Sequence, residues 1–288
     1  TTFLYRLAGA KDWLTIGTDD NAPFRVFHDV SGMPLGSVLE YRAVTRDAAG
    51  RVAASGSWAV VGKAQVGGGE VENGDPVTQP SSVAIAGTLN GEMGCPHTPL
   101  GNGDNDWEPD CDQAQMHLDG NDQIWKGTWT LPAGPYGYKA ALNRSWTENY
   151  GAKGEKDGGN VDFETTDGTV SFYYDHATHW VTSDEEGPII TAPGTFQSEL
   201  GCSADWAPAC MRPWLQDKDG DGVYTWSTKL IPAGSWNFKI AHGLSWTENY
   251  GEGGVRDGGE MTVTVPSAGS TTTFRYDSAT HLTSVTSQ

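Results

Sequence analysis

The sequence predicts an all-β protein built from three consecutive β-sandwich domains, of which the second and third are homologous copies. Its 288 residues include 38 glycines and 15 prolines, and no segment keeps a helical apolar period for three turns. The heptapeptide S-W-T-E-N-Y-G at residues 145–151 returns unchanged at 245–251. A period near 100 residues is too long for a solenoid unit and fits two whole domains in tandem. The length has room for one further domain.

Residues 1–66 alternate in strand fashion, and turn-like segments at 17–21 and 47–50 separate the strands. Tyr41, on a strand that ends in a D-x-x-G turn, is placed like a corner tyrosine, so this segment resembles an immunoglobulin-like or fibronectin type III domain. We expect it to act as a spacer. The expected strands are 3–7, 23–27, 38–46 and 56–61.

The rest of the chain divides at two polar segments. Residues 67–80 are Gly-rich and have almost nothing to bury, which is typical of a linker. Module one then covers 81–182 and module two covers 188–288, with only 183–187 between them. A link this short predicts that the two modules sit close together with limited freedom.

Charge and hydropathy exclude some classes of partner. The net charge of −19 argues against nucleic acid and against anionic membrane surfaces, since both need a basic footprint. No run of about 18 apolar residues is present to span a bilayer. The chain begins in a strand-like run rather than a basic and then apolar leader, which we interpret as the start of a mature piece or fragment. We expect a monomer.

The four cysteines fall two per module. Of the three possible connectivities, only Cys95–Cys111 with Cys202–Cys210 keeps each module self-contained. Such local disulfides predict an oxidising, secreted setting. Zinc is the competing interpretation, but the C-x2-C spacing of zinc sites is missing.

A strand in each module carries a repeated lysine. In P-Y-G-Y-K-A-A-L (135–142), alternation places Tyr136, Tyr138 and Ala140 on one face, as it does Trp236, Phe238 and Ile240 in the copy. That face is the core side, so Lys139 and Lys239 point outward. Their retention in both copies indicates a function on the outer face, although a merely solvated lysine is the simpler alternative.

Trp146 and Trp246 stand among Ser, Thr, Glu and Asn, which is not a core-strand pattern. Exposed aromatic faces usually mark binding surfaces. A sugar suits such a face, because its C–H side packs on an indole while its hydroxyls bond to nearby polar groups. Lys139 and Asn149 supply donors and an acceptor, and Glu148 is a further acceptor. The alternative is that these tryptophans fold back and plug the end of the sandwich.

The order G-T-L/F…G-C…W-x-P…P-A-G-x-Y/W-x-Y/F-K…S-W-T-E-N-Y-G…F-x-Y-D occurs in both modules. It resembles the starch-binding modules of secreted pullulanases, amylopullulanases and related α-amylases, in which an immunoglobulin-like domain often accompanies them. The resemblance implies α-glucan binding without catalysis, as part of a larger hydrolase. It implies a glucan site in each module, made of Trp107, Lys139, Trp146 and Asn149, and of Trp206, Lys239, Trp246 and Asn249. Glu148 and its copy Glu248 are further candidates, as acceptors for a hydroxyl group.

Asp217, Asp219 and Asp221 have the D-x-D-x-D-G spacing of a calcium loop. The Glu expected at loop position 12 is absent, because that residue is Thr228. A hairpin turn is the safer interpretation, and a weak structural Ca²⁺ in module two is the alternative. We expect no other cofactor.

Two other functions compete with sugar binding. A glycosidase would need a carboxylate pair, for which Glu148 and Asp157 are the obvious candidates. A structural spacer or adhesion protein would keep all its tryptophans in the core. The repeated outward lysine beside a tryptophan in polar company favours non-catalytic binding of starch, glycogen, pullulan or maltooligosaccharides.

Overall fold

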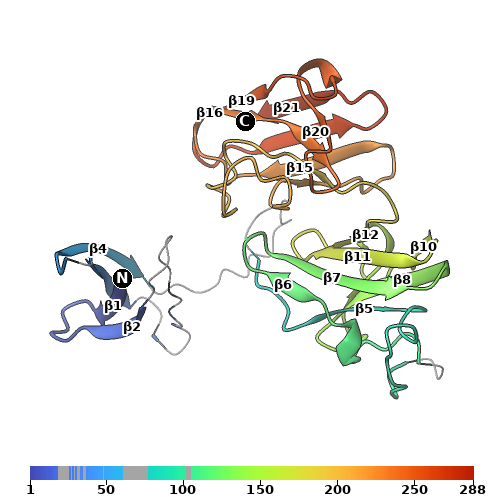
Figure 1. Cartoon of the computed structure of the whole chain (residues 1–288), viewed down its shortest axis with the longest axis horizontal. Helices are drawn as coiled ribbons and strands as arrows, with labels where there is room; N and C mark the ends of the chain where they lie inside the picture. Colours follow the sequence, from blue (N-terminus) through green and yellow to red (C-terminus); the bar gives the residue numbers. More distant parts are fainter. Residues whose placement is uncertain are drawn as a thin grey trace. The chain divides into compact units, whose positions relative to one another are not determined.

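The computed structural model describes residues 1–18, 26, 28, 30, 33–34, 37–47, 49–60, 77–101 and 105–288. The chain forms two compact units, Thr1–Gly67 and Gly68–Gln288 (Figure 1). The second unit contains both modules. Almost every regular element is a strand, so the predicted all-β class is confirmed. No helix among these residues has the length and apolar character needed to cross a membrane.

The first unit contains one antiparallel sheet in the order β2-β1-β3-β4. Part of the expected strand at 23–27 lies outside the described residues, and the immunoglobulin-like assignment stays a prediction. The turn expected at 17–21 was wrong at its start, because Gly17 and Thr18 belong to a strand and pair with Phe3 and Thr2. The strands are β1 (Thr2–Leu7), β2 (Leu14–Thr18), β3 (Val38–Arg46) and β4 (Val52–Val60).

Module one is a sandwich of two four-stranded antiparallel sheets. One has the order β10-β8-β5, with β9 paired to β8, and the other has the order β12-β11-β7-β6 (Figure 1). The elements are β5 (Val83–Gly87), the 3₁₀ helix η1 (Asp112–Ala114), β6 (His117–Asp119), β7 (Ile124–Leu131), β8 (Gly134–Leu142), β9 (Asn149–Tyr150), η2 (Ala152–Gly154), β10 (Val161–Thr165), β11 (Gly168–Asp175) and β12 (Trp180–Ser183).

Module two repeats this design in a more divided form, with sheets of four, three and two strands. The long strand β8 of module one is split here into β16 and β17, and Lys239 lies between them. The elements are β13 (Ile190–Thr191), β14 (Trp214–Leu215), β15 (Val223–Thr228), β16 (Gly234–Phe238), β17 (Ile240–His242), β18 (Glu248–Tyr250), η3 (Glu252–Gly254), β19 (Met261–Val265), β20 (Thr272–Asp277) and β21 (Thr283–Ser287).

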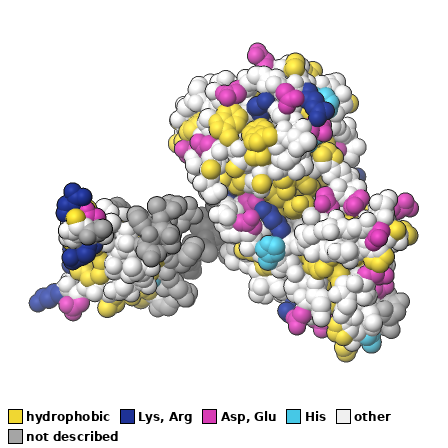
Figure 2. Space-filling view, in the orientation of Figure 1, with side chains coloured by type: hydrophobic (Ala, Val, Ile, Leu, Met, Phe, Trp, Pro, Cys, Tyr) yellow, Lys and Arg dark blue, Asp and Glu magenta, His cyan; other side chains and the backbone are white. Residues whose placement is uncertain are grey.

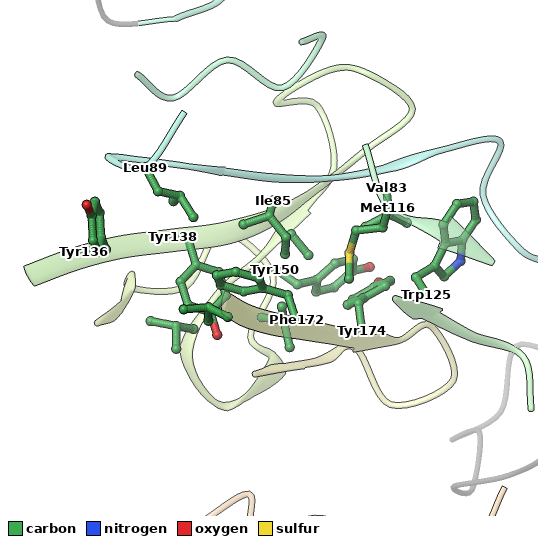
Figure 3. Packing of buried hydrophobic residues seen from close by; sticks show 14 of the residues in the cluster. Val83, Ile85, Leu89, Met116, Trp125, Tyr136, Tyr138, Tyr150, Phe172 and Tyr174 are labelled. Atoms are coloured by element: carbon green, nitrogen blue, oxygen red, sulfur yellow. The ribbon is translucent and has the colours of Figure 1, made fainter. Parts of the chain in front are cut away.

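Each module has its own aromatic core between the sheets. In module one, Tyr138 of β8 meets Phe172 of β11 edge to face, with ring centroids 4.9 Å apart (Figure 3). In module two, Phe238 and Phe274 repeat this contact at 5.0 Å. Perpendicular aromatic pairs of this kind add to the stabilisation from burial. The predicted core face of β8 is confirmed, since Tyr138 and Ala140 are fully buried.

The two modules contact each other through a small mixed interface. Ile124 of module one packs with Ile189, Met211 and Trp214 of module two. The carboxylate of Asp122 accepts the backbone N–H of Met211 at 3.1 Å. Burial raises the pKa of Asp122 above its ordinary value even though the Lys126 ammonium lies 2.6 Å away.

Candidate functional site

The repeated heptapeptide forms the turn between β8 and β9 and its counterpart in module two. Asn143 and Arg144 adopt left-handed backbone conformations, with φ of 54° and 58°, as do Gly243 and Leu244. This pair of residues reverses the chain sharply, so the following residues return along β8. The Leu142 N–H then bonds to the Glu148 carbonyl at 2.9 Å. The turn projects from the core, and Trp146 is half-buried while Trp246 is 38% exposed.

A second tryptophan lies beside each of these indoles. The ring centroids of Trp107 and Trp146 are 6.2 Å apart with 44° between the ring planes. Those of Trp206 and Trp246 are 6.3 Å apart at 43°. The two modules therefore present the same pair of inclined, partly exposed indoles. Trp246 is exposed, whereas the half-buried Trp146 donates its indole N–H to the Leu100 carbonyl at 3.0 Å. Neither ring is sealed inside the sandwich, and sugar binding by these rings stays a prediction.

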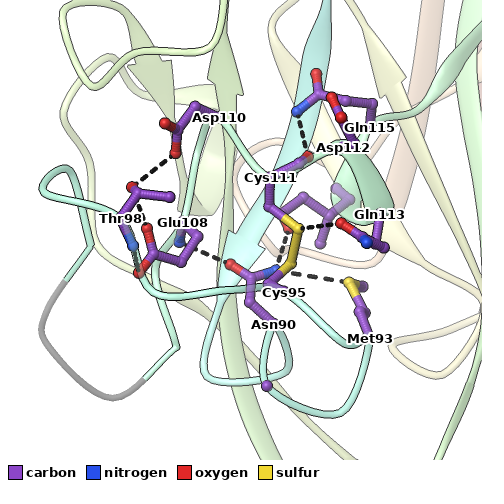
Figure 4. The surroundings of a disulfide bond; sticks show 12 residues. Asn90, Met93, Cys95, Thr98, Glu108, Asp110, Cys111, Asp112, Gln113 and Gln115 are labelled. Carbon is purple, nitrogen blue, oxygen red and sulfur yellow. Dashed lines mark hydrogen bonds between the residues drawn. A yellow bond between two sulfur atoms is a disulfide. The ribbon is translucent and has the colours of Figure 1, made fainter.

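Trp107 and Trp206 are held in place by their cysteine-bounded loops. Both have left-handed backbones, with φ of 59° and 54°, which is uncommon for a bulky residue and requires support from its surroundings. As predicted, the disulfide Cys95–Cys111 closes the first loop (Figure 4) and Cys202–Cys210 closes the second.

A buried amide side chain anchors each loop from below. The Asn90 carbonyl oxygen accepts the N–H groups of Gly87 and Glu108 at 3.0 and 2.9 Å (Figure 4). In module two, Gln197 replaces it and exchanges two hydrogen bonds with the backbone of Ala207. The residue type differs between the copies, but each amide ties the residue after the tryptophan to the sheet edge.

The asparagine after each exposed tryptophan has one buried atom without a partner. The Asn149 amide nitrogen donates to the Trp146 carbonyl at 3.1 Å and to the Asp157 carboxylate at 2.8 Å. Because both partners are acceptors, the orientation of the amide is fixed and its oxygen faces the other way. That oxygen is buried and has no hydrogen bond, and the same holds for Asn249. Leaving a buried acceptor unsatisfied costs about 1–3 kcal/mol, so such atoms call for an explanation.

The repeated lysines also lack partners among the residues that the structure describes. Lys139 lies on the outer face of β8, opposite Ala86 of β5, and one residue further along β5 the Gly87 carbonyl accepts the Trp107 N–H. Two residues along β8, Ala141 pairs with Asn149. Within the part of the chain that the structure describes, the ammonium groups of Lys139 and Lys239 form no hydrogen bond or ion pair, although both side chains are partly buried.

The candidate acceptors Glu148 and Glu248 already have intramolecular partners. Each accepts the hydroxyl of the tyrosine two residues later, at 2.9 Å from Tyr150 and 2.8 Å from Tyr250. Glu248 also lies 3.1 Å from His242 Nδ1. Both glutamates thus help to hold the turn, and their direct contact with a sugar stays a prediction.

The acidic loop before β15 brings its three carboxylates together. One oxygen from each of Asp217, Asp219 and Asp221 lies within 4.8 Å of the others. Asp217 accepts the N–H groups of Gly220 and Gly222, both at 2.9 Å, which is the hydrogen bonding of a tight turn. These bonds fit the hairpin-turn interpretation, and Ca²⁺ binding stays a prediction.

Sequence reasoning did not identify the role of Asp157 and Asp257. Each carboxylate accepts a hydrogen bond from the side-chain amide of the site asparagine, at 2.8 and 2.7 Å, and so fixes its orientation. The backbone N–H of each aspartate also donates to the backbone carbonyl of that asparagine. The available signal was the D-G-G motif repeated eight residues after each asparagine. Asp157 was considered only as one of a catalytic carboxylate pair.

Fold and site together define a tandem pair of all-β modules. Each has two inclined indoles, and each has a lysine and a buried asparagine oxygen that find no partner among the described residues. The chain belongs to the pullulanase X25 domain family, whose model matches residues 82–181 and again 189–283. The resemblance to modules of pullulanases and amylopullulanases is therefore confirmed.

Two curated relatives are amylopullulanases. That of Thermoanaerobacterium saccharolyticum is 36% identical over 189 residues, which are 62% of this chain and 14% of that protein. That of Thermoanaerobacterium thermosulfurigenes is 35% identical over 187 residues, which are 62% of this chain and 10% of that protein. The chain thus spans only a small part of their length. Among solved structures, pullulanase from Bacillus acidopullulyticus aligns with 15% identity and a TM-score of 0.32, covering 73% of this chain and 29% of that one.

Proposed function

We propose that the two modules bind α-glucans without breaking them and hold an attached amylolytic enzyme on its polymer. The family and the amylopullulanase relatives support this proposal, and so does the matched site in each copy. The local disulfides and the kind of polymer fit a secreted protein.

The observation that carries the proposal is the pair of inclined, partly exposed indoles that recurs in both modules. The C–H face of a glucose unit packs on these indoles, and the nearby lysine ammonium donates to one of its hydroxyls. Both interactions suit a neutral polyol, and neither requires a reactive group.

The duplication of the site has a physical reason. A small open site makes few contacts, and these must offset the cost of ordering a flexible sugar chain, so each site is weak alone. When one polymer reaches both sites, the second binding event occurs at a high effective concentration and the apparent affinity rises.

The test is the double substitution W146A/W246A, measured as retention on insoluble starch. We expect the double variant to lose retention and each single variant to retain an intermediate amount, because one site remains. The control is Leu282→Ala, which removes an exposed apolar side chain outside the site and should bind like wild type. Cellulose serves as the β-glucan control, and thermal melting establishes that each variant folds.

Wild-type retention by the folded double variant would contradict the proposal and favour a structural or adhesion role. Release of reducing sugar from starch or pullulan by this chain would contradict the non-catalytic assignment. Glu148 and Asp157, the carboxylates considered for that chemistry, both hold the turn by hydrogen bonds.

A further inference from the structure

Module one has a shallow, open recess along β8 and β10. Strand alternation places Pro135 and Gly137 on the same face of β8 as Lys139, because Tyr136 and Tyr138 point into the core. Same-face residues on a strand are about 7 Å apart, so the recess begins one such step from the site lysine. The recess and the indole site therefore lie along one face of one sheet. The lining residues are Thr88, Pro135, Tyr136, Gly137, Asn160, Asp162, Phe163 and Glu164.

Residue 137 is a glycine, which lets the Asp162 carboxylate lie over this part of β8. Gly137 pairs with Asp162 across the strands, and a Cβ at Gly137 would lie 2.6 Å from the Asp162 carboxylate. The equivalent residue in module two is Asn237. Its side chain donates to Glu260 at 2.9 Å and accepts from Thr262 at 3.1 Å, so it lies across the corresponding surface. The two modules thus differ here, while their indole sites match.

The chemistry of the recess suits a chain of hydroxyl groups. Asp162 and Glu164 are exposed and have no hydrogen bond or ion pair within the described part of the chain, and the same is true of the amide of Asn160. Carboxylates accept hydroxyl protons in charge-assisted hydrogen bonds. In module two the positions of these carboxylates carry Thr262 and Thr264.

We propose that this recess is an additional subsite in module one, which binds glucose units of the same α-glucan beyond those on the Trp107 and Trp146 indoles. The inference rests on the proposed function, and it makes the two modules unequal. Module one binds a longer stretch of the polymer than module two does. Gly137, Asp162 and Glu164 determine this difference.

The experiment uses the full chain with one indole site removed at a time. Titration with maltooligosaccharides of increasing length reports module one in W246A and module two in W146A. We expect the affinity of W246A to rise about ten-fold from short to long oligosaccharides, which corresponds to about 1.4 kcal/mol, and the affinity of W146A to change little. Gly137→Asn, combined with W246A, copies the residue of module two and should abolish the rise while leaving short oligosaccharides unaffected.

A second variant does not depend on filling the recess. Asp162→Asn with Glu164→Gln removes both charges at nearly constant shape and should reduce the rise, whereas the control Asp167→Asn changes a carboxylate at the turn beyond β10 and should not. Equal length dependence in the two modules, or a rise that survives Gly137→Asn, overturns the inference and leaves the proposed function standing. Absence of binding to every oligosaccharide by wild type and both single variants overturns the proposed function, and the inference with it.

Discussion

At the residue scale, the site contains an asparagine whose amide nitrogen is hydrogen bonded, while its buried amide oxygen has no partner among the described residues. The sequence predicted Asn149 and Trp146 because they recur in a polar segment. It did not predict how the amide is oriented, since that requires Asp157 to return beside Asn149 with a left-handed backbone, φ 55°. Gly151 makes this return possible, because a side chain there would collide with the Gly159 carbonyl. Repetition identifies which residues matter, whereas the contacts between them follow only from the fold.

A histidine beneath the turn makes the stability of module one depend on pH. His179 stacks on Tyr150 with 3.8 Å between ring centroids, and burial lowers the pKa of His179 to about 4. The unfolded chain takes up this proton near pH 6.5, whereas the folded module does so only near pH 4. The contribution of His179 to stability is therefore present above pH 6.5 and is lost as the pH falls toward 4.

We predict that urea unfolding of residues 68–288 shows this loss between pH 6.5 and 4, and that His179→Asn makes the dependence shallower. Asparagine does not titrate and tolerates the left-handed backbone of residue 179, φ 61°. Burial raises the pKa of Asp122 and Glu186, which acts in the opposite direction but is common to both proteins. An unchanged pH dependence in the variant would show that His179 is not the group responsible.

At the element scale, the strands of the modules followed from alternation and turn residues, and the shortest elements did not. The core face of β8 was predicted correctly because every second residue is apolar. Strands of two residues carry no such pattern. β9 exists because it pairs with the longer β8, and β13 and β14 pair with each other. The disulfide pairing was predictable, because the cysteines lie two to a module.

The two disulfide loops differ in length, which gives a prediction about stability. Cys95–Cys111 spans 16 residues and Cys202–Cys210 spans 8. Removing the longer cross-link by C95A/C111A should cost about 3 kcal/mol in the loop-entropy description, and C202A/C210A about 0.6 kcal/mol less. Because Trp107 and Trp206 lie inside these loops, each pair of substitutions should also weaken sugar binding by its own module. Denaturant unfolding and oligosaccharide titration measure the two effects, and full affinity in a folded variant would contradict the link.

At the scale of the whole molecule, the short connection between the modules predicted proximity, and the structure shows direct contact through Asp122, Met211 and Trp214. No sequence pattern indicated which surfaces meet, since buried contacts between domains lack a periodic pattern. Charge was predictable from composition, and Figure 2 shows more Asp and Glu than Lys and Arg on the visible face of the modules.

We predict that Asp122→Ala weakens the coupling between the modules. The substitution leaves the Met211 N–H without its acceptor and removes the nearest partner of Lys126. Calorimetry of residues 68–288 should then show two transitions where wild type shows one. Asp221 is the matched control, because its carboxylate accepts the N–H of Val223 at the start of β15 at 2.8 Å, as the Asp122 carboxylate accepts the N–H of Ile124 at the start of β7 at 3.2 Å. Splitting by Asp221→Ala as well would contradict the assignment.

The contact between the modules also determines the order in which the two copies must follow each other along the chain. Counted from the second cysteine of each loop, Met211 and Trp214 correspond to Asp112 and Gln115. Module two thus carries the apolar pair Met211 and Trp214, and module one supplies the surface on which this pair packs, at Ile124 and Asp122. A chain with the copies transposed would set Asp112 against an acidic loop and leave two hydrophobic side chains in water. Shuffling these repeats is therefore not neutral, and each copy is adapted to its place.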